Sequence, residues 1–169
     1  APCSLRAMSQ VNIAIVGLGF GAEFIPIYLR HPQANMYAIC QRTEESLNEV
    51  GDKYGIEKRF QSFDDVLRGP NISAIHINAP IPNHGEQAIA ALEAGKHVMV
   101  TKSMVYTMEE AERVVAAVDR TGLVLLVTLT MRGRYSFMDA KRVCDAGDLG
   151  ELFLADAHYV HDLRDNFKQ

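Results

Sequence analysis

Cysteine, long apolar runs and excess positive charge are all scarce in this chain of 169 residues. The three cysteines, Cys3, Cys40 and Cys144, are too far apart in sequence to form a metal-binding or redox motif. We therefore expect reduced thiols, as in cytoplasmic proteins. The longest apolar run, Leu123–Val127, has the length of a strand and is too short for a membrane-spanning helix. A net charge of −4 gives no indication of a nucleic-acid or anionic-membrane partner.

The N-terminal residues lack the apolar core of a signal peptide. Met8 is therefore a candidate start of the natural chain, with residues 1–7 outside the domain. The length of 169 residues suits one domain, or one domain with part of a second. A chain of this length buries roughly 70% of its unfolded surface, so it needs no disulfide bonds to fold.

Short β-branched runs alternate with longer helical segments along most of the chain. This alternation predicts a parallel sheet with helices on both faces, and right-handed crossovers favour a doubly wound arrangement. The expected strands are Val11–Val16, Met36–Cys40, Ser73–Asn78, His97–Val100 and Leu123–Leu129. The expected helices are Phe20–Arg30 with Pro26 as a defect, Glu44–Lys53 capped by Thr43 and ended by Gly55, Ser62–Leu67 capped by Ser62, Glu86–Ala94 ended by Gly95, and Met108–Arg120 capped by Thr107 and ended by Gly122.

A glycine-rich turn follows the first expected strand at once and opens the first helix. In this context its G-x-G-x-x-A spacing is typical of a dinucleotide-binding turn. The first glycine permits the tight turn, the second leaves room for a pyrophosphate, and the alanine lets the helix pack close to the strand. The helix N-terminus offers N–H groups to the phosphates. A glycine-rich turn that binds nothing is the alternative. The residues predicted to bind NAD or NADP here are Gly17, Leu18, Gly19, Phe20, Gly21 and Ala22.

The acidic residue expected about 20 residues further on, which holds the ribose hydroxyls of NAD, is missing. The second strand ends in Gln41 and Arg42 instead. Gln41 can hydrogen-bond a ribose, and Arg42 can pair with a 2′-phosphate. This pair favours NADP modestly. In the alternative, NAD binds through Gln41 and Arg42 is a solvated loop cation.

Three later segments carry a more specific pattern. They are Asn78-Ala79-Pro80 followed by His84, Ala88–Val98 with its Ala-Gly-Lys-His-Val end, and Thr101-Lys102-Ser103. In this order after a GxGxxA turn, they resemble the glucose–fructose oxidoreductase / inositol dehydrogenase (Gfo/Idh/MocA) family. The family pattern runs Thr-Pro-Asn-x-x-His, Ala-Leu-x-Ala-Gly-Lys-His-Val and Glu-Lys-Pro. The chain departs from it at Thr101 and Ser103, which replace Glu and Pro, and at Ile81, which replaces the Asn.

The resemblance implies a Rossmann-type doubly wound domain and NAD(P)-dependent hydride transfer at a carbon of a sugar or polyol. The family's lysine beside the nicotinamide carries over to Lys102, which is thus the predicted catalytic residue. Lys102 follows the fourth expected strand, at the edge where open α/β sheets bind ligands. A lysine there can donate to a substrate oxygen or join proton transfer, and an exposed loop lysine is the alternative.

The resemblance also places Asn78, Ala79 and Pro80 along the cofactor, with His84 shaping this loop. A packing or capping role for His84 stays open beside a catalytic one. The family's second-domain Asp and His have no matching positions. No catalytic role is assigned to the late polar residues His158, His161 and Asp162. Arg132 and Arg134 are expected in a solvated loop, and a position facing the substrate cleft is the alternative.

The pattern changes after Thr130. We expect a helix over Phe137–Ala146, a turn at Gly147–Gly150 and one long strand over Glu151–Val160. Such a strand indicates the start of a second α+β domain with a mostly antiparallel sheet. Because a lone strand cannot bury its own face, this second domain is expected to be incomplete, and the chain by itself to be weakly active or inactive.

The predicted domains are residues 8–130 for cofactor binding and 131–169 for the start of a substrate and oligomerisation domain. The expected partners are a small sugar or polyol and, in the full-length form, copies of the same chain, without nucleic acid, membrane or bound metal. Two other classes stay open. The first is a non-catalytic nucleotide-binding sensor or scaffold, which the altered triplet Thr101-Lys102-Ser103 favours. The second is a methyltransferase with a related sheet, which would leave the lysine motif unexplained.

Overall fold

The computed structural model describes residues 10–158 and 160, and the chain divides into two compact units at the boundary between Leu129 and Thr130. The first unit is built on a six-stranded sheet in which all the strands pair in parallel. Its strands are β1 (Val11–Val16), β2 (Ala34–Cys40), β3 (Lys58–Phe60), β4 (Ala74–Ile77), β5 (His97–Thr101) and β6 (Leu125–Thr128). Its helices are α1 (Leu18–Gly21), α2 (Ile25–Arg30), α3 (Glu44–Tyr54), α4 (Phe63–Arg68), α5 (His84–Glu93) and α6 (Met108–Thr121), with 3-10 turns at Ala22–Phe24 and Ile81–Asn83.

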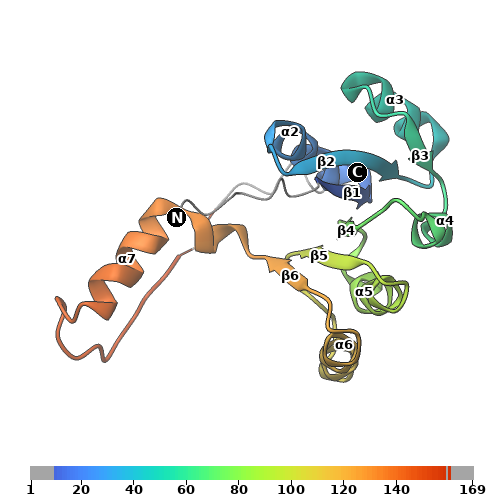
Figure 1. Cartoon of the computed structure of the whole chain (residues 1–169). Coiled ribbons are helices and arrows are strands. Elements are labelled where there is room, and N and C mark those ends of the chain that lie inside the picture. The colour runs from blue at the N-terminus through green and yellow to red at the C-terminus, as the bar shows by residue number, and fades with distance from the viewer. Residues whose placement is uncertain (1–9, 159, 161–169) are drawn as a thin grey trace, which may run out of the picture. The chain divides into compact units, whose positions relative to one another are not determined.

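The strand order is β3-β2-β1-β4-β5-β6 (Figure 1). The chain runs outward from β1 to β3, then crosses back to β4 and continues outward on the other side. This order confirms the predicted Rossmann-type sheet. Ligands of such sheets bind outside the carboxyl ends of the strands where the order reverses, here between β1 and β4.

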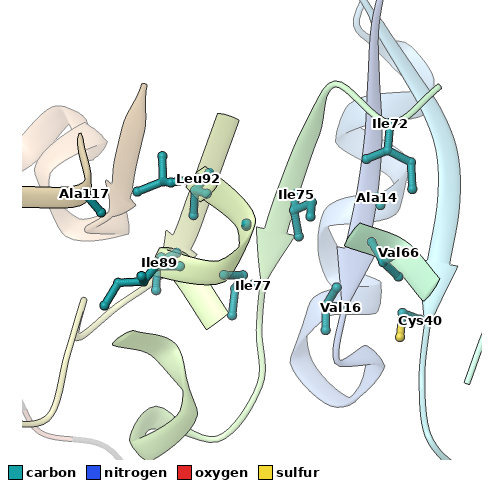
Figure 2. Packing of buried hydrophobic residues seen from close by; sticks show 14 of the residues in the cluster. Ala14, Val16, Cys40, Val66, Ile72, Ile75, Ile77, Ile89, Leu92 and Ala117 are labelled. Carbon is teal, nitrogen blue, oxygen red and sulfur yellow. The ribbon is translucent and has the colours of Figure 1, made fainter. Parts of the chain in front are cut away.

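Each face of the sheet has its own apolar core, because side chains of a strand alternate between the two faces. Ile13 and Ile15 of β1 pack with buried residues of α1, α2 and α3. Ala14 and Val16 pack on the opposite face with residues of α4, α5 and α6. Figure 2 shows this second cluster, in which Ile77 lies near the helix that carries Ile89. Helices therefore cover both faces of the sheet.

Local capping determines several helix ends as the sequence predicts. Thr107 Oγ1 accepts a bond from the Glu110 N–H, and the Glu110 carboxylate accepts from the Thr107 N–H, which completes a capping box at the start of α6. Gly55 and Gly122 end their helices in the left-handed conformation. The side-chain caps predicted at Thr43 and Ser62 do not form: both residues occupy the N-cap position, but neither side chain bonds to its helix.

In the first unit, one predicted helix is divided and one strand was not predicted. The helix expected over Phe20–Arg30 consists of α1, a 3-10 turn and α2, because Pro26 has no N–H and lies in the first turn of α2. The short edge strand β3 was not predicted, since Lys58-Arg59-Phe60 shows no apolar alternation of strand length. It forms because it pairs in parallel with β2.

The second unit contains a 3-10 turn, Thr130–Gly133, and the helix α7 (Tyr135–Asp145). The strand predicted over Glu151–Val160 is not present, since residues 151–158 and 160 have irregular backbone. A strand requires a hydrogen-bonded neighbour, and the described part of this unit supplies none. His158 forms an exposed ion pair with Asp156, while His161 and Asp162 lie outside the described residues. None of the described helices is long and apolar enough to cross a bilayer.

Candidate functional site

A cavity of about 710 Å³ lies at the carboxyl ends of β1, β2 and β4. The predicted site residues that line it are Gly17, Gly19, Gln41, Arg42, Asn78, Ala79 and Pro80. The lining also includes residues that the sequence did not place in the site, namely Val16, Cys40, Thr43, Gln61, Ser62, Phe63, Asn83 and Gln87. Gln61 directly follows β3, so the same edge rule would have found it if this strand had been predicted. The predicted residues outside the lining are Leu18, Phe20, Gly21, Ala22, His84 and Lys102.

Two glycines of the turn are required by the fold. Gly17 has φ +87°, and a Cβ there would lie 2.7 Å from the Asn78 carbonyl oxygen. A Cβ on Gly21 would lie 2.9 Å from Ile15 Cγ2 and 3.2 Å from Asn78 Cβ. Both glycines therefore let the turn pack directly against the end of β4.

Gly19 is different, because no contact among the described residues explains its missing side chain. A Cβ on Gly19 would have no heavy atom within 4 Å, and its φ is not in the left-handed region. Gly19 nevertheless lines the cavity at the start of α1. A glycine without a packing or conformational reason, next to a cavity, fits a ligand that approaches the backbone closely.

Gln41 links the end of β2 to the glycine-rich turn. Its side-chain Oε1 accepts a hydrogen bond from the Leu18 N–H at 3.3 Å. The Leu18 side chain is buried in the core, and its N–H is occupied by this bond. Gln41 therefore has its amide N–H groups left to offer, and the exposed guanidinium of Arg42 lies beside it in the cavity lining.

Gln87 on α5 carries a polar atom that the fold leaves unsatisfied. Its Oε1 is buried and has no hydrogen-bond partner among the described residues. Because Gln87 also lines the cavity, this oxygen is a candidate acceptor for a donor on a bound molecule. Together with the open space at Gly19, it shows that the residues present fit a ligand with both anionic and donor groups, such as a dinucleotide.

Lys102 directly follows β5, beside the glycine-rich turn. Its Nζ lies 5.3 Å from the centroid of the Phe20 ring, which belongs to α1. The next residue, Ser103, has φ +57°, an uncommon conformation for a residue with a side chain. This arrangement brings the predicted catalytic lysine close to the predicted cofactor turn.

His84 connects the loop that lines the cavity to the loop that carries Lys102. The ring is buried at the start of α5, with Nε2 2.6 Å from the Ala79 carbonyl oxygen and Nδ1 2.8 Å from the Ser103 carbonyl oxygen. These contacts match the loop-shaping role rather than a free catalytic imidazole. The lysine of the Ala-Gly-Lys-His-Val segment is also structural, since Lys96 Nζ donates to the carbonyls of Gly69 and Ile72 at 2.7 and 2.9 Å.

Residues 11–129 match the model of an oxidoreductase family with an NAD-binding Rossmann fold. The chain belongs to the Gfo/Idh/MocA family. It is 31% identical over 146 residues to scyllo-inositol 2-dehydrogenase (NAD(+)) of Bacillus subtilis, which covers 84% of the chain and 42% of that relative. It is 25% identical over 142 residues to myo-inositol 2-dehydrogenase of Thermotoga maritima, covering 83% and 42%.

Solved structures of this family show the same fold. Scyllo-inositol dehydrogenase from Lactobacillus casei, with NAD(H) and scyllo-inositol bound, is 28% identical with a TM-score of 0.78, covering 85% of this chain and 43% of that one. The WlbA dehydrogenase from Bordetella pertussis, in complex with NADH and UDP-GlcNAcA, is 28% identical with a TM-score of 0.79, covering 83% and 43%. The chain spans less than half the length of these family members.

Proposed function

We propose that the full-length protein is an NAD(P)-dependent dehydrogenase or reductase that transfers hydride between nicotinamide and a carbon of a sugar or polyol. The observation that carries this proposal is the open space at Gly19, beside a cavity at the switch point of the sheet. The inositol dehydrogenases among the relatives support the substrate class.

Each part of the site has a role in this proposal. The turn Gly17–Ala22 binds the pyrophosphate through backbone N–H groups, and Asn78–Pro80 line the cofactor site with His84 holding their loop. Gln87 Oε1 accepts from a donor of the cofactor. The bound nicotinamide supplies the hydride chemistry, while the protein binds and orients the reactants.

Lys102 is the residue we propose to act on the substrate. Its ammonium donates to the reacting oxygen and stabilises the negative charge that builds there during hydride transfer. An interaction formed mainly in the transition state raises kcat rather than cofactor affinity. Phe20, under the ammonium, holds the lysine next to the turn by a cation–π contact.

Steady-state kinetics of the full-length protein, with a panel of sugars and polyols, test this role. Lys102→Ala is expected to lower kcat about 10²–10⁴-fold, with cofactor affinity little changed. Lys102→Arg is also expected to be poor, because guanidinium does not release its proton. Lys53→Ala is a matched control, since Lys53 Nζ also lies over an aromatic ring, that of Tyr54, but on α3. A Lys102→Ala enzyme with more than about half the parental kcat would show that this lysine is only a loop cation.

We also propose NADP as the preferred cofactor, with NAD as the second. The Gln41 carboxamide oxygen is occupied by the Leu18 N–H, so this side chain offers donors, and Arg42 adds a cation that pairs with phosphate. The Bacillus subtilis relative is named for NAD(+), so both cofactors are needed in the test. Arg42→Ala should weaken NADP binding more than NAD binding, and equal losses would remove the preference.

We propose residues 8–130 as the cofactor domain and residues 131–169 as the start of the substrate and oligomerisation domain. The contact boundary between Leu129 and Thr130 supports this division. A cytoplasmic homo-oligomer is the assembly we propose, supported by the sparse cysteines and by the family resemblance. Light scattering on the full-length protein distinguishes an oligomer from a monomer.

A further inference from the structure

A continuous series of hydrogen-bonded polar side chains runs through the core next to the site. The Tyr28 hydroxyl lies 2.9 Å from His76 Nδ1, and His76 Nε2 lies 2.9 Å from Thr101 Oγ1. The Thr101 hydroxyl in turn donates to Asn78 Oδ1. His76 is fully buried, and Tyr28 and Thr101 are nearly so. Four side chains from α2, β4, β5 and the loop after β4 are thus connected.

Along this series of side chains, each residue donates a hydrogen bond to the next, from Tyr28 to Asn78. Thr101 uses its one proton toward Asn78, so its oxygen accepts from His76 Nε2–H. Burial lowers the pKa of His76 to about 4, so the ring is neutral and its Nδ1 carries no proton. Nδ1 therefore accepts from Tyr28, whose other contact, Met99 Sδ at 3.2 Å, is a weaker acceptor. Each side chain in the series determines the orientation of the next.

At one end of this series, Thr101 and Asn78 lie next to the proposed catalytic lysine and the glycine-rich turn. Asn78 forms the wall against which Gly17 and Gly21 pack. Thr101 directly precedes Lys102, and it stands where the family pattern has Glu. A threonine hydroxyl cannot offer the two acceptor oxygens of a carboxylate. Its single oxygen instead accepts a hydrogen bond from His76 Nε2–H.

We propose that Thr101 is a positioning residue: with Tyr28 and His76 behind it, its hydroxyl holds Asn78 against the glycine-rich turn and fixes the start of the Lys102 loop. This inference rests on the proposed function, since it assigns a role in binding the dinucleotide. It adds a role for Thr101 of the altered triplet, through its contacts with His76 and Asn78.

Cofactor titration on the full-length protein tests the proposal, with NADH and NADPH fluorescence as the probe. Thr101→Val keeps the shape and removes the hydroxyl, and it is expected to weaken binding of the preferred cofactor about 2- to 10-fold. Thr101→Ser keeps the hydroxyl and is expected to bind within about twofold of the parent. Thr128→Val is the matched control, because Thr128 is the register partner of Thr101 on β6 and donates only to a backbone carbonyl, that of Val100. It is expected to bind like the parent.

Nitrogen-15 NMR of the imidazole gives a readout that a packing role would not move. The parent is expected to show the Nε2–H tautomer of His76, and Thr101→Val to change its ring-nitrogen shifts. If Thr101→Val does not fold, Tyr28→Phe tests the other end of the series. This variant is expected to shift the same resonances and weaken cofactor binding about twofold.

The outcomes separate this proposal from the function on which it rests. A parent protein that binds neither NADH nor NADPH overturns the proposed function, and this inference with it. A parent that binds, together with a Thr101→Val variant of equal affinity, overturns the positioning role alone. Equal losses in Thr101→Val and Thr101→Ser also overturn it, because packing rather than the hydroxyl would then be responsible.

Discussion

Alanine at Gly19 should separate the folding and binding roles of the glycine-rich turn. The space around a Gly19 Cβ is open to 4 Å, whereas a Gly21 Cβ would meet Ile15 Cγ2 at 2.9 Å and Asn78 Cβ at 3.2 Å. Both residues lie in α1, so the two substitutions are chemically matched. We expect Gly19→Ala to impair cofactor binding and Gly21→Ala to impair stability.

The expected magnitudes follow from these contacts. A Gly→Ala change at a compatible helical position raises the free energy of unfolding by up to about 1 kcal/mol, so Gly19→Ala should be at least as stable as the parent. Overpacking at Gly21 lowers the free energy of unfolding by about 1–3 kcal/mol. In the proposed binding mode, a methyl at Gly19 would keep the pyrophosphate from the backbone N–H groups. Losing one hydrogen bond to a charged group, about 1.5–3 kcal/mol, would weaken binding about 10- to 150-fold.

Urea unfolding measures the free energy of unfolding of each variant, and NAD(P)H titration of the folded protein measures its cofactor affinity. Gly55→Ala is the control: Gly55 ends α3 with φ +67° and open space around it, so alanine should lower the free energy of unfolding by about 1–2 kcal/mol without changing affinity. Gly19→Ala binding within about twofold of the parent would refute the assignment of the pyrophosphate to this turn. A Gly19→Ala variant less stable than Gly21→Ala would refute the packing argument.

Three further outcomes concern the core. Because burial lowers the pKa of His76 from 6.5 to about 4, the unfolded chain binds this proton first, and the free energy of unfolding should fall by up to about 3 kcal/mol as the pH drops from 6.5 to 4. Urea unfolding across this range should show the slope in the parent and lose it in His76→Gln. Lys96→Met leaves the carbonyls of Gly69 and Ile72 without their donor, so it should lower the free energy of unfolding by about 2 kcal/mol, while an unchanged cofactor affinity would separate Lys96 from the site. Burial raises the pKa of the Cys40 thiol to about 11, so a thiol reagent should label it at neutral pH only on unfolding, and rapid labelling of the folded protein, with the other cysteines changed to serine, would contradict this.

The sequence placed some of the residues that line the cavity and missed others. Gly17 and Gly19 follow β1 closely, and Asn78–Pro80 follow β4, so these cavity-lining residues come after strands that apolar runs predict. Gln87 was missed because its position in the cavity depends on how α5 packs on the sheet. Nothing in its sequence neighbourhood marks the buried oxygen that lacks a partner.

The sequence by itself determined the features that depend on interactions within a few residues. The left-handed end of α6 at Gly122 and the capping box of Thr107 and Glu110 are of this kind, because their partners lie within one turn of the chain. The alternation of apolar runs and helices was also sufficient for the doubly wound sheet, since only right-handed crossovers bury both of its faces.

Only the tertiary structure decided which distant residues meet. The edge strand β3 exists because β2 offers it a partner, and the strand expected over Glu151–Val160 is absent because nothing in the described residues pairs with it. The bond between Leu18 and Gln41 spans 23 residues, and the one between Tyr28 and His76 spans 48. Such contacts depend on the order and register of strands, which local preferences do not specify. A buried polar side chain therefore acquires its partner, and its role, only when the sheet brings separate segments together.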